Sequence, residues 1–239
     1  MIGVLGGMGP LATADFMRKV VECTSAGCDQ EHVPMIVHNV PQIPDRSAAI
    51  VGGGPSPLAA LARGLEKLES AGCSCIVIPC NTAHHWYEDL RRLSNVPILH
   101  IADAACASLI ARGLKPGAAV TVLATEGALV SGFYEARLAL HGFQYRPLSA
   151  AQDAELVHMG IRLVKGGRTQ IARPLFESVL QTARQSGIEA AVLGCTEIAL
   201  ALESPALCVE PLVVDSNKAL AEACVHWWQQ HVAEPMAAA

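Results

Sequence analysis

Two stretches of the chain decide its fold: Gly72-Cys-Ser-Cys-Ile-Val-Ile-Pro-Cys80-Asn-Thr82 and Gly187-Ile-Glu-Ala-Ala-Val-Leu-Gly-Cys195-Thr-Glu197. In each stretch an apolar run typical of a buried strand ends directly at a cysteine, and residues that can cap a helix follow. The two cysteines lie 115 residues apart in the sequence. This internal repeat predicts two related halves, each presenting one cysteine at the end of a strand.

A second pair of segments repeats in the same order along the chain. Ile2-Gly-Val-Leu-Gly-Gly-Met-Gly9 matches Val120-Thr-Val-Leu-Ala-Thr-Glu-Gly127 at an offset of 118 residues. Elsewhere, short runs rich in Val and Ile alternate with stretches of helical period, which is typical of parallel sheets with crossover helices. The predicted strands are apolar throughout, as expected when helices cover both faces of a sheet. The sequence therefore predicts an α/β fold with two pseudo-symmetric halves.

The expected elements follow from this alternation. Strands are predicted at residues 2–5, 35–40, 75–78, 98–101, 120–123, 144–147, 190–193 and 209–212. Helices are predicted at residues 57–70, 102–112, 132–140, 154–165, 169–186 and 217–231. We expect the first domain to span residues 1–100 and the second residues 101–212. A C-terminal helix within residues 213–239 is expected to return and complete the first domain.

Composition and charge exclude several classes of function. The 239 residues carry a net charge of −5, whereas nucleic-acid-binding proteins normally present a basic face. No apolar run approaches the roughly 18 to 20 residues that span a bilayer. The amino terminus enters an apolar strand without the charged start of a secretory signal. We therefore expect a cytoplasmic protein with no nucleic-acid or membrane partner.

The cysteine pattern indicates neither disulfides nor a metal site. The chain has nine cysteines, an odd number, and none of them forms a Cys-x-x-Cys pair. His84 and His85 are adjacent and would face different sides of a helix, so they make a poor pair of metal ligands. We expect no metal, and most of the cysteines, such as Cys73, Cys106 and Cys224, are expected to be small core residues.

Cys80 and Cys195 differ from the other cysteines in their positions. Each is expected at the carboxyl end of a parallel strand, where open α/β folds bind ligands. A helix starting after each cysteine would place the positive end of its dipole near the thiol and favour the thiolate. Inversion at a carbon is most simply done by two groups on opposite faces, so the pair predicts two-base proton transfer. The sulfurs are then expected across one cleft, roughly 7 to 8 Å apart.

These residues make the chain similar to the aspartate/glutamate racemase superfamily, and most of all to its aspartate racemase branch. The resemblance covers essentially the whole chain in order, and it implies two pseudo-symmetric α/β domains with the active site in the cleft between them. It also implies racemisation of an amino acid, above all aspartate, without pyridoxal phosphate or another cofactor, frequently in a homodimer. The matching segments are Ile-Gly-Val-Leu-Gly-Gly-Met-Gly-Pro-Leu-Ala-Thr-Ala (2–14), Asp-Gln-Glu-His (29–32), Pro-Gln-Ile-Pro-Asp-Arg (41–46), Pro-Cys-Asn-Thr-Ala-His (79–84), Leu-Ala-Thr (123–125), Val-Ser-Gly-Phe-Tyr (130–134) and Gly-Cys-Thr-Glu (194–197).

The resemblance also implies roles for individual residues. Cys80 and Cys195 would be the catalytic acid and base. His84 would contact and support Cys80 rather than the substrate. Arg46 and Lys165 would hold the side-chain carboxylate of the substrate. The remaining residues expected to bind the substrate, mostly at its amino-acid head or α-carboxylate, are Met8, Asn81, Thr82, Thr125 and Thr196.

One segment departs from the aspartate racemase pattern. Where that pattern reads Leu-Ala-Thr-Thr-Gly-Thr, this chain has Leu123-Ala-Thr-Glu126-Gly-Ala128, so two hydroxyls are lost and a carboxylate is gained. If Glu126 pointed into the cleft it would repel an acidic substrate, which leaves the side chain of the substrate open. The stretch Gly52-Gly-Gly-Pro-Ser-Pro57 is expected to be a flexible loop, either a passive connector or an active-site lid.

Three alternatives stay open on the sequence alone. A related enzyme could use the same cysteines to racemise another amino acid, or to act as a lyase or isomerase. A non-catalytic small-molecule binding protein could keep the cleft, although binding needs no opposed acid and base. Gly7-x-Gly9-x-x-Ala12 also fits a variant dinucleotide fingerprint, but the second predicted strand ends without the acidic residue that would bind a ribose.

Overall fold

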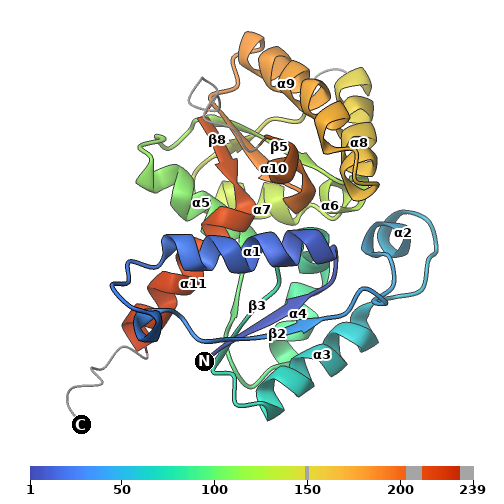
Figure 1. Cartoon of the computed structure of the whole chain (residues 1–239). Coiled ribbons are helices and arrows are strands. Elements are labelled where there is room, and N and C mark those ends of the chain that lie inside the picture. Colours follow the sequence, from blue (N-terminus) through green and yellow to red (C-terminus); the bar gives the residue numbers. More distant parts are fainter. Residues whose placement is uncertain (149–150, 203–211, 232–239) are drawn as a thin grey trace.

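Two parallel four-stranded sheets form the framework of the protein (Figure 1). The structure is a computed structural model, and it describes residues 1–148, 151–202 and 212–231. The strand order is β2-β1-β3-β4 in the first sheet and β6-β5-β7-β8 in the second, and all paired strands are parallel. The predicted α/β fold with two sheets is confirmed. The strands are β1 (Ile2–Gly6), β2 (Met35–Asn39), β3 (Cys75–Val77), β4 (Ile98–Leu99), β5 (Ala119–Ala124), β6 (Gln144–Tyr145), β7 (Ala190–Gly194) and β8 (Leu212–Asp215).

The two sheets repeat each other down to their register. Each central pair joins the first and third strands of its half, β1 with β3 and β5 with β7. Ile2 lies opposite Cys75 in the first pair, and Val120 lies opposite Ala190 in the second. These are the residues that the two sequence echoes match, so the slightly different offsets of the echoes describe one structural repeat.

Helices cover both faces of each sheet, as the apolar strands predicted. The predicted helices at 57–70, 102–112, 132–140, 154–165, 169–186 and 217–231 are all present, with ends that differ by up to three residues. The observed helices are α1 (Pro10–Cys23), α2 (Arg46–Val51), α3 (Leu58–Ser70), α4 (Tyr87–Leu93), α5 (Ile101–Ala111), α6 (Glu126–Val130), α7 (Phe133–Leu140), α8 (Ala151–Lys165), α9 (Thr169–Gln185), α10 (Thr196–Leu202) and α11 (Ser216–His231), with short 3-10 turns η1 (Asp29–Glu31) and η2 (Thr82–Trp86). None of the helices in the described ranges is both long and apolar enough to cross a membrane.

The last predicted strand lies mostly outside the described residues. It was expected at 209–212, and the observed strand β8 begins at Leu212 and ends at Asp215. Residues 209–211, like Cys208, fall in the range that the structure does not describe. The start of the predicted strand is therefore untested, and its end lies three residues farther on, because the apolar run Leu212-Val-Val214 continues past the predicted end.

One apolar cluster runs through both halves of the molecule. It contains Ile2 and Val4 of β1, Val120 of β5 and Leu220 of α11, none of which is exposed to solvent. Leu5 of β1 points to the opposite face of the first sheet from Val4, and it belongs to a second apolar cluster there. The central strands β1, β3, β5 and β7 therefore bury both of their faces, which explains their continuous apolar runs, whereas the edge strands β2 and β6 are only partly buried.

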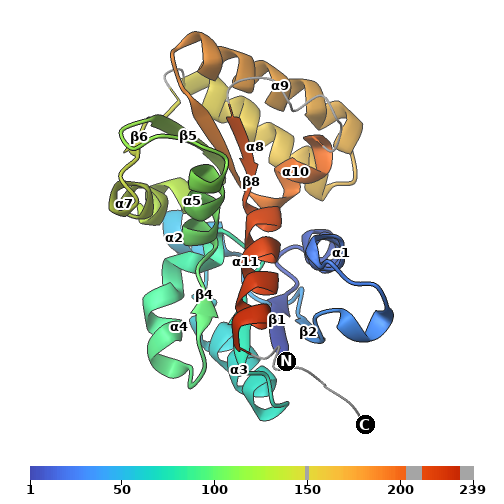
Figure 2. The same cartoon turned by 90° about the vertical axis from the view of Figure 1, so that its left-hand side faces the viewer.

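Helix α11 connects the two halves. It leaves the second sheet directly after β8 and packs against α1 and α5 (Figure 2). The division of the chain at residues 100 and 212 stays a prediction. The strand pairing differs from the predicted division at one boundary. Strand β8 adds residues 212–215 to the second sheet, whereas residues 213–239 were assigned to the first domain.

Candidate active site

A small cavity lies where the carboxyl ends of the four central strands meet. Met8 follows β1, Cys80 follows β3, Thr125 follows β5 and Cys195 follows β7, so both halves contribute to its wall. Its volume is about 20 Å³, which is room for a single water molecule. The lining residues are Met8, Asp45, Arg46, Ser47, Cys80, Asn81, Thr82, Thr125, Lys165, Cys195, Thr196 and Glu197.

Cys195 is held by a carboxylate that comes from its own loop. Its thiol donates a hydrogen bond to Glu197 Oε2 at 3.1 Å, and the Thr196 hydroxyl donates to the same oxygen at 3.2 Å. Burial raises the pKa of the Cys195 thiol well above its ordinary value, and the negative charge of Glu197 raises it further. The opposing charge of Lys165 does not reverse this shift. The start of α10 favours the thiolate, as expected, through a hydrogen bond from the Glu197 backbone, but burial and the Glu197 charge outweigh it, so Cys195 rests as a thiol.

Cys80 is held through its main chain instead. His84 is buried, and its Nε2 accepts a hydrogen bond from the Ile101 N–H at 3.1 Å. Its other ring nitrogen, Nδ1, must then carry the proton and donate to the Cys80 carbonyl oxygen at 2.9 Å. Burial lowers the pKa of His84 to about 4, so the ring is neutral near pH 7. His84 thus fixes the Cys80 loop, while the neighbouring His85 is exposed, so the two histidines face different sides as expected.

The residues after Cys80 do not cap a helix with their side chains. Asn81 precedes the 3-10 turn η2, yet its side chain makes no cap bond there. It donates from Nδ2 to Ser216 Oγ at 3.0 Å and accepts the Tyr134 O–H at 2.5 Å. The Thr82 hydroxyl shares a hydrogen bond of 2.8 Å with the Thr125 hydroxyl from the other half. The capping roles predicted for Asn81 and Thr82 are therefore wrong, because long-range partners take these groups.

Two cationic side chains reach the cavity from opposite halves. Arg46 opens α2, where the Asp45 carboxylate caps the helix by accepting the Ala48 N–H at 2.8 Å. The terminal guanidinium nitrogens of Arg46 donate to the carbonyl oxygens of Ile43, Pro44 and Met8 at 3.1 to 3.3 Å. The Arg46 Nε is buried and has no hydrogen-bond partner among the described residues. Lys165 is the last residue of α8, and its side chain lines the cavity while remaining exposed to solvent.

A larger cavity of about 510 Å³ adjoins the small one. Both cavities are lined by Asp45, Arg46, Lys165 and Glu197, so charged groups surround the passage between them. The outer cavity is otherwise lined by glycines and by the apolar residues Pro10, Leu11, Pro41, Ile43, Val164 and Leu200. It can therefore hold a small molecule that is polar at one end and apolar at the other.

The comparisons with known proteins agree with this geometry. A profile of the Asp/Glu/Hydantoin racemase family matches residues 5–224. The chain belongs to this family. It is an amino-acid racemase, as the two strand-end cysteines and the family resemblance predicted.

Individual relatives match the racemase over nearly its full length. The broad specificity amino-acid racemase RacX of Bacillus subtilis (strain 168) is 28% identical, over 94% of this chain and 96% of RacX. The structure of Picrophilus torridus aspartate racemase is 31% identical, covers 95% of this chain and 93% of its own, and gives a TM-score of 0.83. Glutamate racemase from Francisella tularensis, solved with D-glutamate, is 15% identical with a TM-score of 0.69, and covers 96% of this chain and 81% of its own. This last match shows a shared fold.

The structure brings together every site residue that the sequence named for this racemase. Cys80, Cys195 and the seven expected substrate-binding residues all line the small cavity. Their individual roles stay predictions. Among the described residues, no group of three or more His, Cys, Asp or Glu side chains could hold a metal ion. Cys73, Cys106 and Cys224 are buried in the core, as predicted.

The departure from the aspartate racemase pattern lies outside the cavity. Glu126 is exposed at the start of α6 and lines neither of the two cavities. Ala128 is fully buried, and its N–H donates to the Thr125 hydroxyl at 3.2 Å. The carboxylate of Glu126 therefore does not confront a ligand of this racemase. None of residues 52–57 lines either cavity, which favours a connector over a lid for that loop.

Three groups around the cysteines were not predicted from the sequence. Glu197 was read as a helix cap, although its position two residues after Cys195 is the signal that could have paired it with the thiol. Tyr134 lies in one of the matching segments but was given no role. Ser216 carried no signal at all, because its bonding partner Asn81 is 135 residues away in the sequence.

Proposed function

We propose that this racemase inverts an acidic amino acid, aspartate or aspartate and glutamate, by two-base proton transfer between Cys80 and Cys195. The observation that carries the proposal is that both cysteines line one small cavity together with Arg46 and Lys165. The two halves approach that cavity from opposite sides, as a reaction on two faces of one carbon requires. The thiols supply both the acid and the base, so the proposal needs no cofactor.

The proton path follows from the resting state of the site. Cys195 rests as a thiol because burial and Glu197 raise its pKa. In the proposed path Cys80 acts as the base that removes the α-proton of the first enantiomer, and the electron pair of the broken C–H bond passes to the α-carbon. Cys195 delivers its proton to the opposite face, which completes inversion and leaves Cys80 as thiol and Cys195 as thiolate. In the reverse direction the two roles exchange.

The charges of the cavity fit an acidic substrate. The Arg46 Nε is buried and has no partner within the part of the chain that the structure describes, and a substrate carboxylate placed beside it would satisfy this donor. Lys165 offers a second positive charge from the other half of the molecule. The carboxylates of Asp45 and Glu197 are available for the ammonium group of the amino acid. We therefore assign Arg46 and Lys165 to the carboxylates of the substrate.

Substrate binding requires the cavity to widen. Its present 20 Å³ holds one water molecule and not an amino acid. Helix α2 packs against α6 beside it, so closely that a Cβ on Gly127 would lie 2.7 Å from Ser47 Cα. The Thr82–Thr125 hydrogen bond also joins the halves. We propose that the two halves separate at these contacts to admit the substrate and close around it.

A second candidate is a racemase of larger, non-acidic amino acids. The observation that favours it is the outer cavity of about 510 Å³, whose apolar walls exceed what an aspartate side chain can fill. The relative RacX, named a broad specificity amino-acid racemase, is in line with this reading. Both candidates use the same two thiols and differ only in where the side chain of the substrate lies.

A racemisation screen by chiral chromatography over the common amino acids tests both candidates. We expect L-aspartate to give D-aspartate, in the presence of a chelator and without the absorbance of bound pyridoxal phosphate. Alkylation of Cys80 and Cys195, followed by peptide mapping, should abolish the activity, and substrate should protect it. Cys28 is exposed and will also react with the alkylating reagent, so Cys28→Ser is the matched control for loss of a cysteine outside the site. This variant should keep full activity before alkylation. Inversion of apolar amino acids alone would favour the second candidate, and no inversion at all would reject both.

We also propose that the racemase works in the cytoplasm as a homodimer. Three apolar side chains of α1, Leu11, Met17 and Val21, are exposed to solvent. Contact with a second copy of the chain would remove these apolar side chains from water, which is favourable. Light scattering after gel filtration should give twice the chain mass of 25.1 kDa, and a monomer at micromolar concentration would contradict the proposal.

A further inference from the structure

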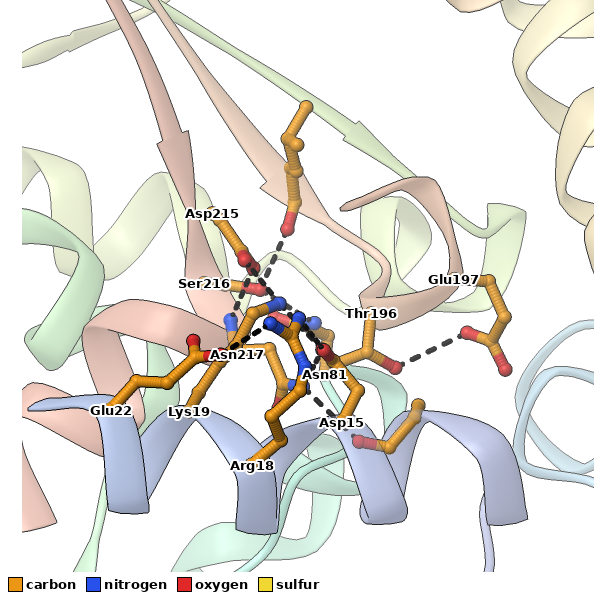
Figure 3. Close-up of polar contacts among 12 residues, drawn as sticks. Asp15, Arg18, Lys19, Glu22, Asn81, Thr196, Glu197, Asp215, Ser216 and Asn217 are labelled. Atoms are coloured by element: carbon orange, nitrogen blue, oxygen red, sulfur yellow. Dashed lines mark hydrogen bonds and ion pairs between the residues drawn. The ribbon is translucent and has the colours of Figure 1, made fainter. Parts of the chain in front are cut away.

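Three consecutive residues at the junction of β8 and α11 bond to the first half of the molecule (Figure 3). Asp215 pairs with Lys19 of α1 at 2.6 Å. Ser216 accepts the hydrogen bond from Asn81, and Asn217 donates to Asp15 of α1 at 2.9 Å. Ser216 and Asn217 are fully buried. This junction is therefore a polar connection between the halves, placed directly behind the proposed site.

Ser216 bonds to both cysteine segments with one hydroxyl group. Its Oγ accepts the Asn81 Nδ2–H at 3.0 Å, and Asn81 directly follows Cys80. The same hydroxyl donates to the Leu193 carbonyl oxygen at 2.6 Å, and Leu193 lies two residues before Cys195. Two hydrogen bonds in series thus connect the loop of one cysteine to the strand of the other.

The direction of these bonds is fixed by their neighbours. The single proton of the Ser216 hydroxyl is used toward Leu193, so its oxygen must accept from Asn81. The Asn81 amide is held in the matching orientation because its Oδ1 accepts the Tyr134 O–H at 2.5 Å. Burial raises the pKa of Tyr134, which keeps the phenol protonated as a donor. The chain Tyr134–Asn81–Ser216–Leu193 therefore has one consistent arrangement.

A buried ion cluster holds Ser216 in place. Lys19 lies between Asp15 at 2.5 Å and Asp215 at 2.6 Å, and both Lys19 and Asp15 are 5% exposed. Burial by itself lowers the pKa of Lys19, but the two carboxylates outweigh it and raise the pKa, so the ammonium stays charged. Buried ion clusters add little net stability, and their best-attested use is to fix one arrangement among several. Here the cluster ties α1 to the residues on both sides of Ser216.

We propose that Ser216 is a positioning residue that sets the placement of the Cys80 and Cys195 sulfurs relative to each other. The inference rests on the proposed two-cysteine mechanism and adds the device that aligns its two halves. Inversion needs each sulfur within reach of one carbon, from opposite faces, at the same time. Removing the Ser216 hydroxyl leaves the segments of both cysteines free to shift, without touching either sulfur.

The test is Ser216→Ala, studied beside the matched control Thr121→Val. Thr121 is also fully buried, and its hydroxyl has no hydrogen-bond partner among the described residues, so the control deletes a buried oxygen that joins nothing. We expect Ser216→Ala to lower kcat by about ten- to hundredfold, the effect of misplacing a catalytic group by about 1 Å, with a smaller change in KM. Thr121→Val should keep wild-type kinetics.

Heavy water supplies a readout that a general structural defect would not move. The wild type should return little deuterium to recovered substrate, because the opposite thiol completes inversion. In Ser216→Ala the misplaced second thiol should fail more often, so the ratio of deuterium exchange to inversion rises. Partial unfolding would lower both processes together and leave this ratio unchanged. An unchanged ratio in folded Ser216→Ala overturns the proposal.

Two further arms keep the experiment decisive. If Ser216→Ala does not fold, Tyr134→Phe replaces it, because it removes the donor that orients Asn81 and keeps the aromatic ring. The same rise in the ratio is expected for Tyr134→Phe, and a wild-type ratio overturns the proposal. The wild-type arm separates the two levels of inference. Absence of inversion there rejects the two-cysteine function itself, whereas normal inversion with unaffected variants rejects only the role of Ser216.

Discussion

The loop after β3 and the loop after β7 occupy equivalent places in the repeat, yet they hold their cysteines by different means. In the first loop, the neutral ring of His84 bonds to the Cys80 main chain and leaves the sulfur without a charged partner of its own loop. In the second, the Glu197 carboxylate accepts a hydrogen bond from the Cys195 sulfur itself. The backbone repeats between the halves, but the side chains around the two sulfurs do not.

The difference teaches how a symmetric fold can produce two unlike thiols. In the proposed two-base reaction the cycle starts and ends with one thiol and one thiolate, so two identical sites would have no preferred resting state. Burial, and after it the negative charge of Glu197, raises the pKa of Cys195 and so favours the proton on that side. The first half contributes a loop held by His84, and the second contributes the burial and the Glu197 charge that raise the pKa of Cys195.

The largest expected effect comes from removing either sulfur. Cys80→Ser and Cys195→Ser should each lower racemisation by about 10²- to 10⁴-fold, because a serine hydroxyl is a far weaker acid and base than a thiol. In heavy water, residual exchange without inversion should favour opposite enantiomers in the two variants, since each keeps the thiol on one face. Equal exchange of both enantiomers by both variants would contradict the two-thiol comparison.

Acid should weaken the Cys80 side of the molecule through His84. The pKa of His84 is lowered by burial to about 4, against about 6.5 in an unfolded chain. Because the unfolded state binds the proton more readily, the free energy of unfolding falls as pH drops from about 6.5 to 4. This contribution is of order 3 kcal/mol by linkage, and His84→Asn should remove it. Urea unfolding of both proteins at several pH values measures the difference.

The matched control for this experiment is His85→Asn. His85 is the next residue and is exposed, so its loss should leave the wild-type pH dependence in place. If His84→Asn and the wild type lost stability in parallel below pH 6.5, the neutral His84 ring would not be the group that titrates on unfolding.

The two cations of the cavity come from different halves, and Arg46 is expected to contribute the more directional contact. Arg46→Lys replaces a planar fork by a point charge, so acidic substrates should bind more weakly by about 1 to 3 kcal/mol. The KM for aspartate, compared with that for an uncharged amino acid that the enzyme accepts, measures this. Unchanged KM values for aspartate would mean that Arg46 serves only the carbonyl oxygens of its own loop.

The smallest change tests the charge beside Cys195. Glu197→Gln keeps an acceptor for the Cys195 thiol but removes the negative charge that raises its pKa. The limb of the pH–kcat/KM profile that reports Cys195 should move to lower pH, with a change in kcat of about tenfold. Glu126→Gln is the control, because Glu126 is exposed and lines neither cavity. A profile that does not move would leave burial as the only cause of the raised pKa.

Much of the fold could be predicted because it depends on local patterns. Apolar runs set where the strands end, and the two echoes matched segments that later proved to lie at the same register. Cys80 and Cys195 could be placed at one edge of the sheets for the same reason. The last strand extends beyond its predicted end at Leu212, since the apolar run continues farther along the chain.

The fine structure of the site could not be predicted in this way. The capping roles expected for Asn81 and Thr82 failed because Ser216 and Thr125, both distant in the sequence, offer competing partners in the folded chain. A thiolate was expected at Cys195 from its place before a helix. That expectation weighed the helix dipole, whose effect is small, and could not include burial, which exists only after folding.

The sequence by itself determined that two cysteines stand at equivalent strand ends of a repeated α/β unit, because hydrophobic periodicity and the repeat are both local properties of the chain. Only the tertiary structure decided which cysteine keeps the proton and how the two are held relative to each other. Those outcomes depend on the loss of water around Cys195 and on the bonds of Ser216 to segments far away in the sequence. Such contacts arise only when both halves have packed together.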